Sequence, residues 1–246
     1  MTDSIQELVA KGDKDRYLSC FFAPDAARPH LFALYAFNLE ITRIRDVVSE
    51  PQIGLVRQQW WLDSLDGIYA GNTPEHPVAL ALAKAITFAK LPREPLRNLI
   101  IAREFDLYDD AMPTLNDLEG YLGETSSSLM QMAALILGRG AAEVAGLAGV
   151  AFGIASVLRS ERKSFLPADM VQGLGEAETI KHLCAHARKR LGEARALQVS
   201  PDVLPAFLPA SVTELYLTRI ERGGGLHVSQ FRRQISLWWA ARHNRF

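Results

Sequence analysis

Residues 31–44 read Leu31-Phe32-Ala33-Leu34-Tyr35-Ala36-Phe37-Asn38-Leu39-Glu40-Ile41-Thr42-Arg43-Ile44 and carry the clearest structural signal in the chain. If these residues form a helix, apolar side chains cover almost its whole circumference, which is typical of a helix buried in the middle of a bundle. Asp25 is expected to cap this helix, which should run to about Val48. Glu50-Pro51 should end it, because proline suits the first turn of the next helix.

Helical spacing also dominates the rest of the sequence, and no Asn-Gly or Asp-Gly hairpin is flanked by alternating apolar residues. Thr114 should cap the helix that follows it. No repeat, low-complexity segment or Pro/Ser-rich linker divides the chain, so we predict one all-α domain of ten or eleven helices over residues 1–246. The further helices are expected over residues 51–71, 74–89, 92–107, 114–137, 142–159, 176–199, 201–221 and 229–241.

Composition limits the function classes. The 246 residues carry a net charge of −1, which does not suggest a basic face for nucleic acid. Two cysteines, Cys20 and Cys184, are too few for a disulfide scaffold, so a reducing compartment is expected. The first residues lack the pattern of a secretory signal or transit peptide, and no stretch of ~18 apolar residues occurs. We expect a cytoplasmic protein that can also lie against the inner membrane.

Three smaller features have alternative interpretations. Trp238-Trp239 lie near several arginines and would suit a membrane interface or a partner groove, but ordinary helix packing is favoured. His182 and His186 are four residues apart and could bind zinc, but a solvated helix face is favoured because no third ligand is evident. The acidic cluster Asp106, Asp109 and Asp110 is expected to be a loop face, with a cation site as the weaker alternative.

Three segments of the chain resemble the squalene/phytoene synthase family, and they have the order and spacing that the family uses. The resemblance implies an all-α isoprenoid synthase fold, a helical bundle around a central cavity. It also places Tyr35 and Tyr121 at positions that face the cavity, although either could be an ordinary core tyrosine with a bonded hydroxyl. The segments are Asp15-Arg16-Tyr17-Leu18 followed by residues 31–37, then Asp117 through Tyr121 to Ser128, then residues 149–159 followed by Phe165-Leu166-Pro167.

The first aspartate motif of the family is degraded. Working members are expected to hold Mg²⁺ between pyrophosphate and aspartates on two facing helices, because Mg²⁺ prefers hard oxygen ligands. Here Thr42 and Arg43 stand where the family has an aspartate pair, and only Asp46 remains. Asp46 could be a metal ligand, but pairing with Arg43 or Thr42 is favoured.

The second motif is degraded further. Gly153, Ser156 and Ser160 occupy the places where the family has Gln, Asn and Asp, and the acidic turn that should follow is missing. Glu161 is the one carboxylate left, beside Arg159 and further cations. Arg159 is expected to be an inward-facing cation or a partner in a salt bridge. Such a pocket could attract an anion such as a phosphate, but it is poorly built to assemble a metal cluster.

Residues 36–40, 45–50 and 53–61, together with the shortened loop before Phe165, are similar to a branch of the family whose aspartate motifs have decayed. The best-known member of that branch assists assembly of respiratory complex I. This resemblance implies a non-catalytic protein, with no cofactor, that binds an isoprenoid or lipid ligand or a respiratory-complex subunit. The alternative is a Mg²⁺-dependent enzyme that condenses two prenyl diphosphates head to head. A third possibility is a carrier or sensor that binds diphosphate through Arg43, Arg159 and Arg162 without ionising it.

Overall fold

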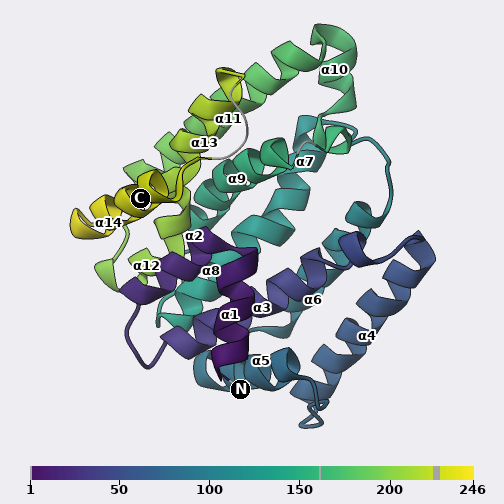
Figure 1. The fold of residues 1–246 in the computed structure, drawn as a ribbon, viewed down its shortest axis with the longest axis vertical. Coiled ribbons are helices and arrows are strands. Elements are labelled where there is room, and N and C mark those ends of the chain that lie inside the picture. Colours follow the sequence, from purple (N-terminus) through teal and green to yellow (C-terminus); the bar gives the residue numbers. More distant parts are fainter. Residues whose placement is uncertain (1, 161, 224–227) are drawn as a thin grey trace.

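The computed structural model describes residues 2–160, 162–223 and 228–246, and within these ranges every regular element is a helix (Figure 1). The all-α prediction is therefore confirmed. The α-helices are α1 Thr2–Gly12, α2 Lys14–Ser19, α3 Arg28–Thr42, α4 Pro51–Tyr69, α5 Pro77–Ala89, α6 Arg93–Ala102, α7 Leu115–Leu122, α8 Ser128–Ile136, α9 Ala142–Arg159, α10 Ala168–Leu174, α11 Glu176–Ala196, α12 Leu204–Phe207, α13 Thr213–Glu221 and α14 Gln230–Arg242.

Tighter and wider turns interrupt or extend these helices. The 3₁₀ helices are η1 Cys20–Phe22, η2 Arg45–Val47, η3 Arg103–Leu107, η5 Lys163–Phe165, η6 Pro201–Val203 and η7 Leu208–Val212, and η4 Gly123–Ser127 is a π-helix. Fourteen α-helices in the described ranges exceed the ten or eleven predicted. The segments 114–137 and 201–221 are broken where one continuous helix was expected, and residues 2–19 and 168–174 form helices that were not predicted.

Helix α3 lies in the centre of the bundle, as its apolar circumference predicts. Leu34 and Phe37 are fully buried, and the helix packs against α1, α5 and α8. Its predicted boundaries are wrong at both ends. Asp25 does not cap it but forms an ion pair with Arg28 at 2.8 Å, and the α-helix ends at Thr42 before the separate turn η2. Pro51 does begin α4.

Helix α9 forms the other half of the core and packs against α11, α8 and η4. A Cβ added to Gly149 would lie 2.3 Å from the Ser127 Cα, so glycine is required for the two backbones to approach this closely. By length and composition alone α9 could cross a membrane, but 61% of it is buried inside the bundle. Its apolar composition is thus explained by its place in the core.

The segment from Thr114 to Ile136 combines a predicted and an unpredicted feature. Thr114 caps α7 with a capping box that includes Asp117, as its sequence position predicts. The π-helix that follows was not predicted. It places the Thr125 hydroxyl where it donates to the Tyr121 carbonyl at 2.7 Å, and the Ser127 hydroxyl where it donates to the Gly146 carbonyl at 3.0 Å. The Ser127 hydroxyl therefore joins the π-helix to α9, whereas the Thr125 hydroxyl bonds back to α7.

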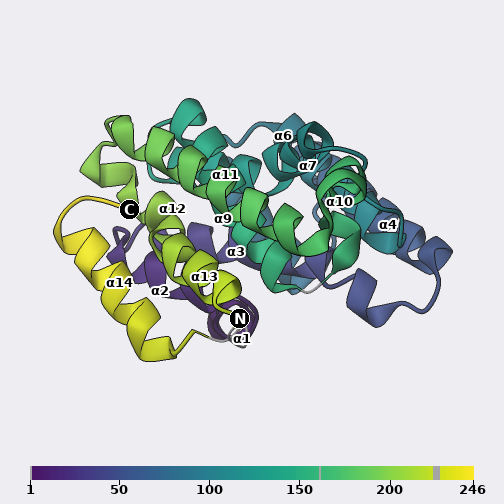
Figure 2. The same ribbon diagram turned by 90° about the horizontal axis from the view of Figure 1, so that it is seen from above.

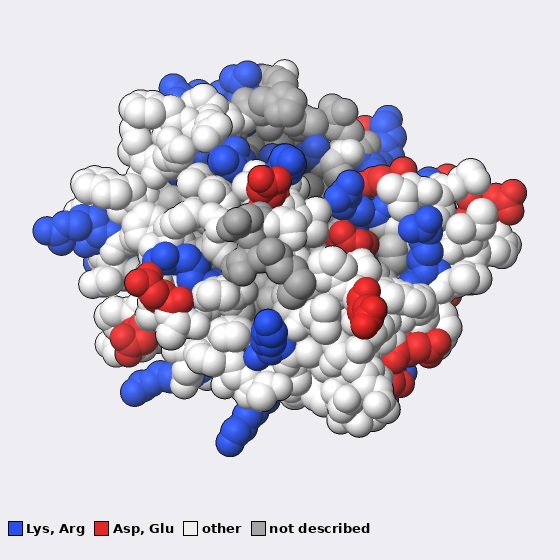
Figure 3. Space-filling model, turned by 60° about the horizontal axis from the view of Figure 1, so that its bottom comes forward, with Lys and Arg blue, Asp and Glu red and all other residues white. Residues whose placement is uncertain are grey.

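The first and last parts of the chain meet through α2 and α14. Helix α14 packs against α2 and η7 at the periphery of the molecule, as both ribbon views show (Figures 1 and 2). Acidic and basic side chains are interspersed over the face drawn in Figure 3, in keeping with a net charge of −1. The favoured prediction for Trp238-Trp239 is wrong: Trp238 is 60% exposed and Trp239 51%, because the opposite side of α14 faces the bundle.

Candidate functional site

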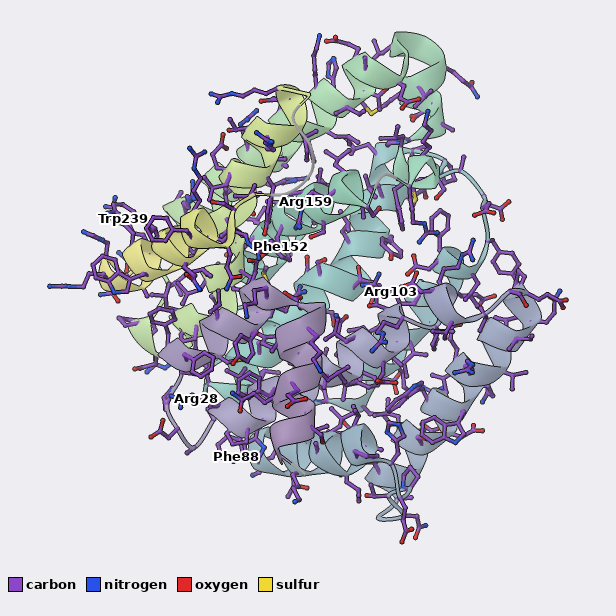
Figure 4. The ribbon with its side chains drawn as sticks, viewed as in Figure 1. Arg28, Phe88, Arg103, Phe152, Arg159 and Trp239 are labelled. Atoms are coloured by element: carbon purple, nitrogen blue, oxygen red, sulfur yellow. The ribbon has the colours of Figure 1, made fainter. Side chains whose placement is uncertain are left out.

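A cleft of about 540 Å³ opens where the α1–α2 junction, the end of α3, η3, the end of α9 and α14 meet. Its described lining includes eight lysine or arginine side chains against four aspartates, so its charge is strongly positive. In Figure 4, Arg159 and Phe152 of α9 lie near the middle of the bundle, with Arg103 on the side of α6. The lining cations are Lys11, Lys14, Arg16, Arg45, Arg103, Arg159, Arg162 and Arg233, and the aspartates are Asp13, Asp15, Asp46 and Asp106.

Asp106, at the end of η3, is at the centre of one polar cluster in the cleft. The Tyr121 hydroxyl donates to Asp106 Oδ1 at 2.8 Å, and Arg103 Nη1 donates to Asp106 Oδ2 at 3.1 Å and to the Tyr121 hydroxyl at 2.7 Å. Arg162 donates to the Asp106 carbonyl at 3.1 Å and lies 3.5 Å from its carboxylate. The ring of Phe165 packs against Tyr121 at 5.2 Å. We call Asp106, Arg103, Tyr121 and Arg162 the Asp106 cluster.

Burial and charge set the protonation of this cluster. Burial raises the pKa of the Tyr121 hydroxyl well above its usual range, so it remains a hydrogen-bond donor at neutral pH. Burial acts to lower the pKa of Arg103, but Tyr121 and Asp106 outweigh it and the net shift is upward. Asp106 is only 4% exposed, so its carboxylate is held by its partners rather than by water. The loop-face prediction for Asp106 is therefore wrong.

A second cluster of the same residue types joins α2, α9, α13 and α14. The Tyr216 hydroxyl donates a short hydrogen bond to Asp15, and Arg233 Nη1 lies 3.1 Å from Asp15 Oδ1 and donates to the Tyr216 hydroxyl at 3.2 Å. The Arg159 guanidinium lies 3.7 Å from the centre of the Tyr216 ring, in cation–π contact. We call Asp15, Tyr216, Arg233 and Arg159 the Asp15 cluster.

The electrostatics of Asp15 are set by burial and by its neighbours. Burial raises the pKa of the Asp15 carboxyl above its ordinary value of 3.8, and the neighbouring Asp13 adds to this, whereas Tyr216, Arg233 and Arg159 act against it. Burial also raises the pKa of Tyr216. The proton of Tyr216 therefore stays in place at neutral pH and stabilises the carboxylate.

Several cationic groups of the cleft have spare hydrogen-bond donors. The buried Nε atoms of Arg103, Arg159 and Arg233 have no hydrogen-bond partner among the described residues. Since a buried donor without a partner costs free energy, an anion placed beside these side chains would be favoured. Phe152, Leu129 and Val157 give the same cleft an apolar wall. The site is therefore suited to a ligand with a negative head and an apolar body.

Six of the nine residues predicted for the cavity line this cleft, and three lie elsewhere. Tyr35 is buried behind the cleft residue Arg16, whose guanidinium lies 5.8 Å from the centre of its ring. Arg43 is exposed and lines a separate hollow with Trp60. Gly153 faces Leu122, where a Cβ would be 2.6 Å from a leucine methyl. The six that line the cleft are Thr42, Asp46, Tyr121, Ser156, Arg159 and Ser160.

Asp46 is exposed and does not make the predicted pairing. Within the described ranges, no hydrogen bond or ion pair joins its carboxylate to Arg43 or Thr42. Thr42 instead donates to the Asn38 carbonyl at 2.8 Å, and the neighbouring Arg45 pairs with Asp109 at 3.3 Å. Glu161, predicted to be the last carboxylate of the second motif, lies outside the described residues.

The carboxylates near the cleft are largely committed to cations. Asp13 pairs with Arg16 at 2.6 Å, and Asp15 and Asp106 lie in the two clusters. In the part of the chain that the structure describes, no three His, Cys, Asp or Glu side chains gather in a way that could hold a metal ion. His186, a candidate zinc ligand, contacts Glu119 at 2.7 Å instead.

Sequence reasoning gave no role to Arg103 in the first cluster or to Tyr216 and Arg233 in the second. It singled out Asp106 only as part of a loop face and Asp15 only as part of a family motif. The i,i+3 spacing of Arg103 and Asp106 is a local signal that a helical reading could have used. Tyr216 and Asp15 are 201 residues apart, so nothing local indicates their contact.

Comparison with known proteins agrees with this architecture. The squalene/phytoene synthase family model matches residues 9–239. The chain belongs to the squalene/phytoene synthase family. The complex I assembly factor 6 of Bos taurus is 35% identical to this squalene/phytoene synthase family member over 241 residues, which cover 88% of this chain and 72% of the relative.

Two solved structures share the fold of this squalene/phytoene synthase family member. A dehydrosqualene synthase in complex with ligand superposes with a TM-score of 0.85 at 17% identity, covering 99% of this chain and 96% of the other. The squalene synthase HpnC from Alicyclobacillus acidocaldarius superposes with a TM-score of 0.79 at 20% identity, covering 91% of this chain and 94% of the other. The predicted isoprenoid synthase fold is thus confirmed.

Proposed function

We propose that this squalene/phytoene synthase family member is non-catalytic, binds an anionic isoprenoid or lipid in its cleft, and acts in assembly of respiratory complex I. The observation that carries the proposal is the cleft lining. Thr42, Ser156 and Ser160 stand on the two helices that would clamp a metal, and arginines surround them. A phosphate or diphosphate is the ligand that such guanidinium groups recognise best.

The donor set of the cleft does not fit Mg²⁺. The ion requires oxygen ligands in near-octahedral geometry, and one or two carboxylates usually supply part of them. Asp13, Asp15 and Asp106 are already paired with cations, and among the described residues no three His, Cys, Asp or Glu side chains gather around Asp46 to hold a metal. Recruiting these aspartates to a metal would leave buried arginines without their counter-ions, which is costly.

The assembly role is supported by relatives rather than by a residue of the cleft. Complex I assembly factor 6 proteins of Bos taurus and Homo sapiens are 35% and 34% identical to this chain over the same span of 241 residues. A respiratory-complex subunit or assembly intermediate is the partner that this similarity favours. The cleft ligand could then report isoprenoid or lipid supply to that process.

The catalytic question is tested by incubating the protein with farnesyl or geranylgeranyl diphosphate and Mg²⁺. We expect no release of pyrophosphate and no condensed hydrocarbon product. Binding of the same diphosphates, measured by calorimetry, should persist in EDTA because arginines rather than a metal hold the head group. Metal-dependent pyrophosphate release would identify the protein as a prenyltransferase and overturn the proposal.

The cleft is tested by comparing Arg159→Gln with the control Arg97→Gln. Arg159 has a buried Nε without a partner, whereas Arg97 pairs with Asp66 outside the cleft. Arg159→Gln should weaken diphosphate binding about tenfold or more, since one hydrogen bond to a charged group is lost. Arg97→Gln should leave binding unchanged, and equal affinities of the two variants would rule out the cleft as the site.

The assembly role is tested in cells that lack their own complex I assembly factor 6 relative. Expression of this chain should restore assembled complex I on native gels, and Arg97→Gln should do so equally well. Failure of the folded wild-type protein to restore any complex I would contradict the assembly proposal and leave the binding result intact.

A further inference from the structure

Helix α14 carries an apolar ridge on its outer side that the cleft does not use. Its four large side chains are strongly exposed, from 48% for Ile235 to 70% for Phe231. At 100° per residue they fall on one side of the helix, because they occupy positions i, i+4, i+7 and i+8. Figure 4 places Trp239 at the outer edge of the molecule. The ridge consists of Phe231, Ile235, Trp238 and Trp239.

The opposite side of α14 packs on the bundle. Leu237 and Ala240 are buried, the Ser236 hydroxyl donates to the Ser211 carbonyl at 3.0 Å, and Arg233 belongs to the Asp15 cluster. The ridge therefore projects outward as a convex edge. A convex aromatic edge suits insertion into a soft surface better than it suits a protein pocket.

The charges around the ridge identify the kind of surface. Residues 222–246 contain five arginines and no Asp or Glu. Arg232, Arg242 and Arg245 are exposed, and Arg242 follows Trp238 by one turn. Beside Trp239, a hollow of about 590 Å³ is lined by Arg195 and Arg245, with no acidic side chain in its described lining. Arginine next to tryptophan at a helix surface is the pattern of a helix that lies in an anionic membrane interface.

A second exposed apolar face provides a contrast. Helix α4 exposes Ile53 and Val56, by 46% and 71%. Residues 47–66 however carry three acidic residues against a single arginine, Arg57. Asp66 is moreover paired with Arg93 and Arg97, so this face is close to neutral and lacks the positive excess of α14. Exposure of apolar side chains alone therefore does not distinguish the two helices. The charge beside each apolar face distinguishes α14 from α4.

We propose that α14 docks this protein onto an anionic phospholipid membrane, with Phe231, Ile235, Trp238 and Trp239 in the interface and Arg232, Arg242 and Arg245 against lipid phosphates. Because Arg233 on the same helix lines the cleft, the docked helix would hold one wall of the cleft at the membrane surface. The inference does not depend on the proposed function, since it rests on the outer side of α14.

The experiment measures co-sedimentation of the full chain with vesicles of phosphatidylcholine alone and of an equal mixture with phosphatidylglycerol. Binding is expected to the mixed vesicles and to weaken with salt. Phe231→Ser/Trp238→Ser should lower the partition constant by at least about tenfold, since each large apolar side chain contributes about that much when buried. Arg242→Gln should lower it about fivefold on mixed vesicles only.

The matched control is Ile53→Ser/Val56→Ser, which removes two exposed apolar side chains from α4 and should leave vesicle binding unchanged. Circular dichroism confirms that each variant is folded. Absence of binding to mixed vesicles, or equal binding by the two double variants, would overturn the proposal. So would a wild-type dimer in analytical ultracentrifugation that Phe231→Ser/Trp238→Ser abolishes, because the ridge would then be an interface between two copies of this chain.

Discussion

The Asp106 and Asp15 clusters contain the same side chains, one aspartate, one tyrosine and two arginines, but they are assembled differently. Arg103, Asp106 and Tyr121 come from adjoining parts of the chain, and Arg103 and Asp106 lie on a single turn. Asp15 and Arg233 come from opposite ends of the sequence and join α2 to α14. One cluster is therefore part of the core, and the other fastens the last helix to the rest.

Because of this difference, we expect the same kind of substitution to affect the free energy of unfolding differently in the two clusters. A buried ion pair stabilises little in net terms, because desolvation offsets attraction, but removing one partner leaves an uncompensated charge. In the Asp106 cluster that charge remains in the core. In the Asp15 cluster it can be relieved by local detachment of α14, which carries few other buried side chains.

The largest effect is expected from Arg103→Met. The substitution leaves Asp106 with Tyr121 and Arg162 but removes its closest cation, so unfolding free energy should fall by about 3–5 kcal/mol. Denaturant unfolding followed by circular dichroism measures it. Arg97→Met is the control: its partner Asp66 is at the surface and keeps Arg93, so little change is expected. Equal losses in the two variants would mean that the Asp106 cluster is no more critical than a surface pair.

Arg233→Met should have a smaller global effect, about 1–3 kcal/mol, but a strong local one. Losing the ion pair to Asp15 loosens α14, so amide hydrogen exchange should accelerate over residues 230–242 far more than in α9. Mass spectrometry of exchanged peptides resolves the two regions. Uniform acceleration across the chain would show that the Asp15 cluster is as central to the core as the Asp106 cluster.

The tyrosines allow a second comparison of the two clusters, with losses similar to that of Arg233→Met. Tyr121→Phe removes a donor to Asp106 and an acceptor for Arg103, whereas Tyr216→Phe removes the donor to Asp15 and an acceptor for Arg233. Each should cost about 1.5–3 kcal/mol, as hydrogen bonds to charged groups do. Thermal unfolding of both variants measures the losses. Near-zero change in either would show that Arg103 or Arg233 alone satisfies the carboxylate.

The sequence predicted the core of this fold better than its cleft. The apolar circumference of α3 and the Ala/Gly composition of α9 are local patterns, so both helices were predicted. The π-helix at Gly123–Ser127 has no comparable pattern, and its Ser127 packs against Gly149, which is distant in the sequence. Thr42, Ser156 and Arg159 were predicted for the cavity from resemblance. Arg233 was not, because its contact with Asp15 forms only when the two ends of the chain meet.

The smallest expected effect is on pH dependence, and it concerns Asp15. Because burial raises the pKa of Asp15 in the folded protein, the native state binds its proton more tightly than the unfolded chain does. The contribution of Asp15 to stability is then fully present below pH 3.8, the ordinary pKa of the group. It is lost as the pH rises through the raised pKa of the native state. Asp15→Asn cannot titrate, so the free energy of unfolding of the wild type relative to this variant should decline as the pH rises from 3.8 towards neutrality.

Denaturant unfolding of the wild type and of Asp15→Asn at each pH measures this difference. The neighbouring Asp13, whose charge adds to the raised pKa of Asp15, is present in both proteins. An increase with pH would mean that Arg233 and Tyr216 outweigh burial and that the Asp15 carboxyl titrates below its ordinary value. The ion pair with Arg233, rather than burial, would then set the electrostatics of the Asp15 cluster.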